Sequence, residues 1–126
     1  GAAMTAKDYA IAGARRQDFN QRFESELAEV DAVICPAGGS VFEADRQAQY
    51  GDADALKEIV RHFQGHFTIP ADLAGTPALT LPCGFSDDGR PYAVQFLGPR
   101  LSEPTLCRIG HAYEQATAWH LRHPPV

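Results

Sequence analysis

The sequence is poor in the residues that mark several large classes of protein. It has two lysines, three widely spaced cysteines and no apolar run long enough to cross a bilayer. Lysine and arginine together number 11 against 16 acidic residues, which gives a formal net charge of −5. This balance argues against nucleic-acid binding, because such binding depends on clustered cations that displace counterions from phosphate. We therefore expect neither a nucleic-acid partner nor a membrane partner.

The few cysteines exclude the usual zinc and redox motifs. Cys35, Cys83 and Cys107 form no C-x-x-C pair and have largely apolar neighbours. Such a sparse, odd set is typical of a reducing compartment, where a free thiol behaves as a small hydrophobe. No signal-peptide pattern opens the chain. We expect a cytoplasmic protein that needs no metal and no cofactor.

Length and composition favour one domain. A chain of 126 residues with 44% hydrophobic residues can form a single compact core. Gly1, Ala2 and Ala3 precede the first methionine, Met4, and we interpret residues 1–4 as cloning residues and a start. The domain is expected over residues 5–126.

A long amphipathic helix is predicted over residues 6–29. Thr5 and Asp8 have the spacing of a capping box, in which a hydroxyl and a carboxylate satisfy free amides at the start of a helix. Asp31 is expected to break the helix. Apolar residues recur at helical intervals between charged ones, and this face comprises Tyr9, Ala12, Phe19, Phe23, Leu27 and Val30.

Three short apolar segments predict β-strands. Residues 32–35 are wholly apolar, which is typical of a strand buried on both faces. Residues 78–81, closed by Pro82-Cys83-Gly84, and residues 92–98 flank a strong turn signal at residues 87–90. They are expected to form an antiparallel hairpin.

The remaining segments predict a Gly-rich loop over residues 37–43, a helix over residues 52–63 and a turn-rich connection over residues 70–77. Ser102 is expected to cap a final helix, and residues 123–126 form a tail. The buried face of that helix is predicted to hold Leu106, Ile109, Tyr113 and Ala116, with Trp119 or His120 continuing it.

The predicted order is helix, strand, helix, hairpin, helix, which is an α/β arrangement. Three strands rarely make a self-sufficient sheet with helices on both faces. The apolar character of residues 32–35 therefore implies neighbouring strands that this chain does not supply. We expect the chain to be a piece of a larger fold.

An ordered series of short elements extends from Phe67 to Gly98. It comprises Pro70, Asp72-Leu73-Ala74-Gly75-Thr76-Pro77, the apolar residues 78–81, Pro82-Cys83-Gly84, Asp88-Gly89 and Ala93-Val94-Gln95-Phe96-Leu97-Gly98. In order and spacing this series resembles the carboxy-terminal region of the amidase-signature hydrolases.

The resemblance extends over nearly the whole chain after Met4. Arg15-Arg16 on the long helix, the strand that ends at Pro36 and the final helix are similar to family elements. Asp72 stands where the family usually has Asn, and Ala93 where it usually has Gly. The resemblance implies a fold: a carboxy-terminal fragment of the family's mixed-sheet α/β fold.

The resemblance also implies that a full-length parent hydrolyses a carboxylic amide. In the family a Ser attacks the carbonyl, a second Ser on a cis peptide and a neutral Lys move the proton, and backbone amides stabilise the oxyanion. Those residues lie upstream of the matching region. Here Lys7 and Lys57 fall on charged helix faces, and Gly38-Gly39-Ser40 lacks the family's Ser- and Gly-rich continuation. We expect no catalytic residue in this chain.

By the same resemblance, the segment before Pro70 lines the acyl side of the parent's pocket for its small-molecule amide. The candidate lining residues are His66 and Phe67. Glutamine-dependent members carry an Asp five residues before this Pro, where this sequence has Gly65. The resemblance thus argues against a glutamine-type amidotransferase and leaves the amide open.

Three alternatives remain. His62 and His66 have the spacing of metal ligands on a helix, but Gly65 lies between them and no third ligand follows, so solvated or structural histidines are favoured. Ser40, His66 and Asp72 could be drawn as a nucleophilic triad, although nothing in the sequence brings them together. The chain could also be an interaction or structural domain that kept the fold and lost the chemistry.

Loss of the rest of a central sheet would expose strand edges and apolar faces. We expect this exposure around residues 33–34 and 94–96. Unpaired strand edges recruit other strands. Self-association through these edges is therefore predicted.

Overall fold

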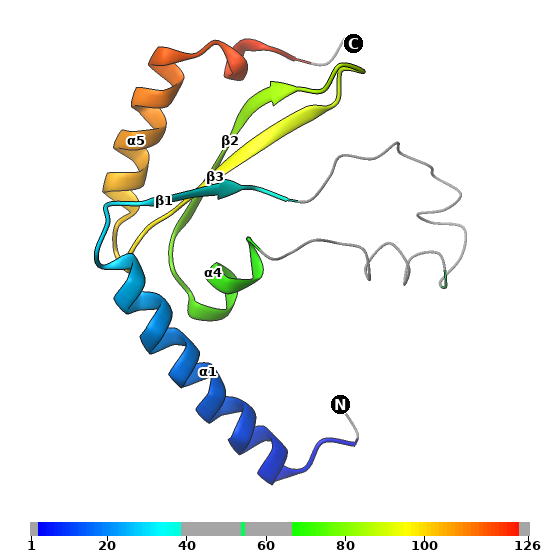
Figure 1. The fold of residues 1–126 in the computed structure, drawn as a ribbon, viewed down its shortest axis with the longest axis vertical. Helices are drawn as coiled ribbons and strands as arrows, with labels where there is room; N and C mark the ends of the chain where they lie inside the picture. The colour runs from blue at the N-terminus through cyan, green and yellow to red at the C-terminus, as the bar shows by residue number, and fades with distance from the viewer. Residues whose placement is uncertain (1–2, 39–53, 55–66, 124–126) are drawn as a thin grey trace.

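The computed structural model describes residues 3–38, 54 and 67–123. Its elements are α1 (Ala6–Leu27), β1 (Val33–Pro36), α4 (Ile69–Ala74), β2 (Ala78–Phe85), β3 (Pro91–Leu97), α5 (Glu103–Ala116) and a short 3₁₀ helix, η1 (Trp119–Leu121). Figure 1 shows that α1 extends well beyond the three strands, whereas α5 lies alongside them. Apart from residue 54, the predicted helix over residues 52–63 falls outside the described residues, as does most of the loop at 37–43.

The three strands form one antiparallel sheet with the order β1-β3-β2. β3 is central, so that Leu97 faces Val33 of β1 and Ala78 of β2 in the register. The turn from Ser86 to Arg90 joins β2 to β3, and Gly89 adopts a φ of 83°, which residues with a side chain rarely take. The predicted hairpin and the α/β fold class are confirmed.

β2 is longer than the sequence predicts. It continues through Pro82-Cys83-Gly84, where its end is expected, and reaches Phe85. A register irregularity between Pro82 and Gly84 takes the strand past the proline. β2 is an edge strand, and an edge position tolerates a residue without an amide hydrogen because no further strand needs that donor.

β1 lies uncovered in the described part of the chain, as expected for a strand whose neighbours this chain does not supply. β1 forms the other edge of the sheet, and Val33 and Ile34 are 40% and 64% exposed. By contrast, the exposure expected at residues 94–96 is wrong, because Gln95 and Phe96 are buried. Phe96 is buried because its ring meets that of Tyr113 edge-to-face at a centroid distance of 6.1 Å.

α1 begins at the predicted capping box. Thr5 Oγ1 accepts a hydrogen bond from the Asp8 amide, and the Asp8 carboxylate accepts one from the Thr5 amide. The helix ends at Leu27, two residues before the predicted end. Leu27 is buried, whereas Tyr9 is 74% exposed. The predicted apolar face is thus confirmed only in the last turns of α1, because no described element covers the earlier ones.

The core lies where the end of α1 meets α4 and the sheet. It contains Leu27, Ala71 and Leu97, with Phe23 and Cys35 packed against them. Leu27 and Phe23 belong to the last turns of α1, and the other three residues come from β1, α4 and β3. The core is therefore small and depends on long-range contacts.

α5 packs on the sheet through most of its predicted face. Leu106 is buried and Tyr113 contacts Phe96, but Ala116 is exposed. The prediction that Ser102 caps α5 with its side chain is wrong. Ser102 has φ −92° and ψ 11°, whereas a capping side chain needs an extended backbone to reach the helix amides. Its hydroxyl oxygen is buried without a hydrogen-bond partner in the described part of the chain.

Candidate functional site

The residues predicted to line a pocket lie just before α4. His66 is outside the described residues, and Phe67 is in a turn with 40% of its surface exposed. The segment at 70–77, predicted as a turn-rich connection, instead contains most of α4. Gly75 ends this helix with a φ of 72°, a left-handed conformation that glycine adopts at little cost.

Two arginines hold α4 against α1. Arg16 Nε donates to the carbonyl oxygen of Leu73 at 3.0 Å, and Arg100 Nη2 donates to that of Ala74 at 3.2 Å. Carbonyls in the last turn of a helix lack partners within it, so both bonds satisfy groups that would otherwise need water. Arg100 Nε also donates to the Glu24 carboxylate of α1 at 2.7 Å. The position of α4 is therefore fixed relative to α1.

The outward face of this segment is apolar. Ile69 is 57% exposed, and Phe67 and Leu73 are also exposed. These side chains offer a surface for packing or for an apolar part of a substrate. They carry no group that can attack a carbonyl or move a proton, so this face can bind but cannot catalyse.

The alternative sites drawn from the sequence fall largely outside the described residues. No group of three or more His, Cys, Asp or Glu is placed to hold a metal ion among residues 3–38, 54 and 67–123. His62, and with it the proposed His62/His66 pair, lies outside these residues, as do Ser40 and His66 of the alternative triad. Asp72 is exposed on α4. None of the described helices has the length and apolarity that a bilayer crossing requires.

Cys35 is a structural thiol. Its Sγ donates to Gln95 Oε1 on the neighbouring strand at 3.7 Å. Burial raises the pKa of the Cys35 thiol, because the charged thiolate loses solvation. Nucleophilic sulfur chemistry needs the thiolate, so Cys35 is poorly suited to it.

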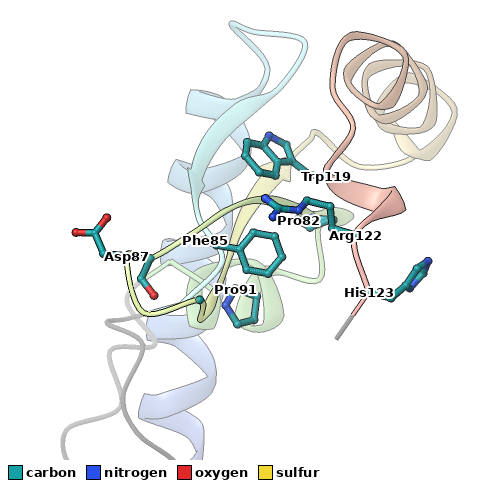
Figure 2. A pocket seen from close by; sticks show the side chains of 9 residues that line it. Pro82, Phe85, Asp87, Pro91, Trp119, Arg122 and His123 are labelled. Atoms are coloured by element: carbon teal, nitrogen blue, oxygen red, sulfur yellow. The ribbon is translucent and has the colours of Figure 1, made fainter. Parts of the chain in front are cut away.

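A second feature is a groove of about 660 Å³ between the β2–β3 hairpin and the chain after α5. Its walls include Pro82, Phe85, Pro91, Trp119, Arg122 and His123 (Figure 2). The sequence predicts that Trp119 or His120 continues the buried face of α5, but α5 ends at Ala116 and both residues lie in η1. No sequence pattern links Phe85 to Trp119, so the groove could not be predicted.

Arg122 is the central cation of this groove. Its guanidinium carbon lies 4.8 Å from the centroid of the Phe85 ring and 5.8 Å from that of Trp119. The two rings are 6.2 Å apart and tilted by 53°. Contact with two aromatic rings within about 6 Å stabilises the cation by cation–π attraction and orients its plane.

Comparison with known families decides the relationship. The family model described as Amidase matches residues 1–107. The chain belongs to the amidase family. It is 41% identical over 112 residues to a glutamyl-tRNA(Gln) amidotransferase subunit from Picosynechococcus sp., a match that covers 88% of this chain and 21% of that protein. The corresponding protein from Synechococcus elongatus is 40% identical over 109 residues, covering 86% and 21% of the two chains.

Solved structures of the family have a similar fold. The corresponding glutamyl-tRNA(Gln) amidotransferase protein from Thermotoga maritima is 29% identical with a TM-score of 0.56, covering 77% of this amidase-family chain and 20% of that one. 6-Aminohexanoate cyclic dimer hydrolase has a TM-score of 0.68 over 96% of this chain and 26% of that one. At 23% identity, the second likeness shows the fold alone. This chain spans about a fifth of the length of the curated relatives it matches.

Proposed function

We propose that this chain is the carboxy-terminal part of an amidase that hydrolyses a carboxylic amide to a carboxylic acid and an amine or ammonia. The observation that carries the proposal is the match of residues 1–107 to the amidase family over only about a fifth of its relatives' length. The remaining part of the parent supplies the Ser, the second Ser and the Lys. This chain supplies packing surface and part of the pocket wall.

The exposed apolar surfaces support this division of roles. Ile34 on the sheet edge and Tyr9 on α1 are largely open to solvent, as is Ile69 at the start of α4. Isolated exposed apolar residues are ordinary, but Ile34 and Tyr9 belong to segments whose sequence pattern predicts burial. In the parent, these faces pack against the rest of the amidase.

The placement of Lys7 also supports a proton relay outside this chain. Lys7 lies in the exposed first turns of α1, and no hydrogen bond or ion pair joins it to a serine in the described part of the chain. Lys57 is outside that part. A nucleophilic hydroxyl needs an adjacent base, so the placement of Lys7 supports a Ser and Lys pair in the remaining part of the parent enzyme.

The pocket wall is assigned to His66 and Phe67, next to α4. Phe67 contributes an exposed ring, which suits an apolar acyl group better than a charged one. The amide is proposed to be a simple carboxylic amide rather than glutamine, because Gly65 replaces the Asp that the resemblance associates with glutamine-dependent members. Curated relatives named as amidotransferase subunits make glutamine the competing substrate to test.

The experiment is to sequence and express the reading frame upstream of Met4 together with this chain. The frame should encode a Ser- and Gly-rich amidase signature, and the longer protein should release ammonia from simple amides faster than from glutamine. Replacing the signature Ser by Ala should abolish the release. An upstream frame without amidase codons would contradict the proposal and favour a non-catalytic domain that kept the fold.

A further inference from the structure

We propose that the groove between the β2–β3 hairpin and η1 binds small carboxylates that carry a planar apolar body. This site goes beyond the proposed amide chemistry and does not depend on it. Three of its wall residues, Trp119, Arg122 and His123, lie beyond residues 1–107, where the family match ends.

The charge of Arg122 calls for an anionic ligand. Its contacts in the described part of the chain are with the aromatic rings of Phe85 and Trp119, and no carboxylate there forms an ion pair with it. Ring faces stabilise the cation but accept none of its N–H bonds in the plane of the guanidinium. That planar edge matches the two oxygens of a carboxylate, which accept a pair of parallel hydrogen bonds.

The nearby acids do not compete for Arg122. Asp88 accepts a hydrogen bond from the Ser86 hydroxyl and pairs with Arg90 within the turn. Asp87 lines the groove, but Figure 2 shows its carboxylate pointing away from Arg122. The charge of Asp88 is therefore neutralised within the turn, and that of Asp87 is directed away from Arg122.

The walls of the groove favour a flat apolar body beside the carboxylate. Pro82, Phe85, Pro91 and Trp119 provide apolar surface around the cation. A groove of about 660 Å³ falls within the range of roughly 300–1,000 Å³ that is typical of small-molecule sites. A cationic ligand is disfavoured, because Arg122 already lies over both rings and would repel it.

Benzoate is the probe, because it combines a carboxylate with a planar ring. Trp119 is the only tryptophan in the sequence, so its fluorescence reports on the groove itself. Benzoate should change this fluorescence in a saturable way, and calorimetry should give the same affinity. Benzamide, which is the neutral isostere, and acetate, which lacks the ring, should each bind at least about tenfold more weakly.

The variants separate this site from non-specific anion binding. Arg122→Gln should weaken benzoate binding about tenfold or more. The affinity of Arg122→Lys should lie between those of Arg122→Gln and the unsubstituted chain, because lysine keeps the charge but lacks the planar guanidinium. Arg108→Gln is the matched control, since Arg108 is an exposed arginine on α5 that donates to Thr105 one turn away on the same helix. It should bind benzoate with the affinity of the unsubstituted chain.

Three results would overturn the proposal: no saturable benzoate binding, equal binding of benzamide, or unchanged benzoate affinity in Arg122→Gln. If Arg122→Gln does not keep the circular dichroism spectrum of the unsubstituted chain, the comparison rests on Arg122→Lys and Arg108→Gln. Equal affinities in those two variants would then refute the assignment to Arg122.

Discussion

Several polar side chains fix one element against another in the described part of the chain. Arg16 and Arg100 bond the last carbonyls of α4, and Tyr113 donates from its hydroxyl to the Pro82 carbonyl oxygen at 3.3 Å. Each of these bonds joins segments that are far apart in the sequence. At the scale of the residue, these bonds hold α4 and α5 in place.

The cysteines should differ in reactivity. Burial raises the pKa of the Cys35 thiol, so a smaller fraction of it is thiolate at pH 8 than in a solvated cysteine, whereas Cys107 is exposed on α5. Iodoacetamide at pH 8 should therefore modify Cys107 before Cys35, and raising the pH should accelerate the reaction at Cys35. Peptide mass spectrometry over time measures both rates. Modification of Cys35 as fast as Cys107 would contradict the assigned burial.

Two helical glycines should respond differently to alanine. A Cβ at Gly13 of α1 would meet nothing within 4 Å. Gly13→Ala should therefore raise the free energy of unfolding by about 0.5–1 kcal/mol. A Cβ at Gly110 of α5 would lie 2.5 Å from Leu79 Cδ2, and Leu79 must move to admit it. Gly110→Ala should therefore gain less than Gly13→Ala, or lose stability. Urea unfolding and circular dichroism of both variants test this, and an equal gain would mean that α5 does not contact β2 closely.

At the scale of the element, short sequence motifs correctly predicted the features that depend on neighbouring residues. The Thr5–Asp8 capping box and the Gly89 turn depend on residues a few positions apart, and both form as the sequence predicts. The failures at Ser102 and at residues 94–96 have a different origin. The orientation of Ser102 depends on the entry angle of α5, and the burial of Phe96 depends on its contact with Tyr113 of α5, so neither is encoded in a short window.

The candidate site shows the same division. Phe67 is identified through a resemblance of ordered motifs, and the structure places it before α4 without testing its role. The groove around Arg122 could not be found in the same way, because it joins Phe85 to residues more than thirty positions later. Only the folded hairpin brings these side chains together.

The buried face of α5 can be tested by paired substitutions. Leu106 is 2% exposed, so Leu106→Ala should cost about 2–5 kcal/mol through the lost contacts and the cavity. Arg108 is exposed, and Arg108→Ala should change stability by at most about 0.5 kcal/mol. Urea unfolding gives both values. Small and equal effects would show that α5 buries a different face.

At the scale of the whole molecule, apolar surface is left without a covering in the described part of the chain. The sheet has β1 and β2 as its two edges, with Ile34 on one of them largely exposed. The long helix α1 buries only its last turns. Open strand edges pair readily with other chains, which links the fold to association.

The chain alone should associate, most simply as a two-fold dimer. Sedimentation equilibrium over a wide concentration range should show mass above that of the 13.7 kDa chain. Ile34→Lys places a charge on the β1 edge and should shift the equilibrium toward monomer, whereas Gln115→Lys on the exposed side of α5 should not. If the unsubstituted chain were strictly monomeric and unfolded in one cooperative thermal transition, the prediction would be refuted and a self-sufficient domain favoured.

The most direct test of the central claim is ammonia release by this chain alone, measured on a panel of aliphatic and aromatic amides and on glutamine. The chain should release no ammonia above buffer, because the Ser, the second Ser and the Lys of the family are proposed to lie in the remaining part of the parent enzyme, and the only two lysines here are Lys7 and Lys57. Turnover that survives repurification and disappears with Ser40→Ala would contradict the account, because it would place a working nucleophile within this chain.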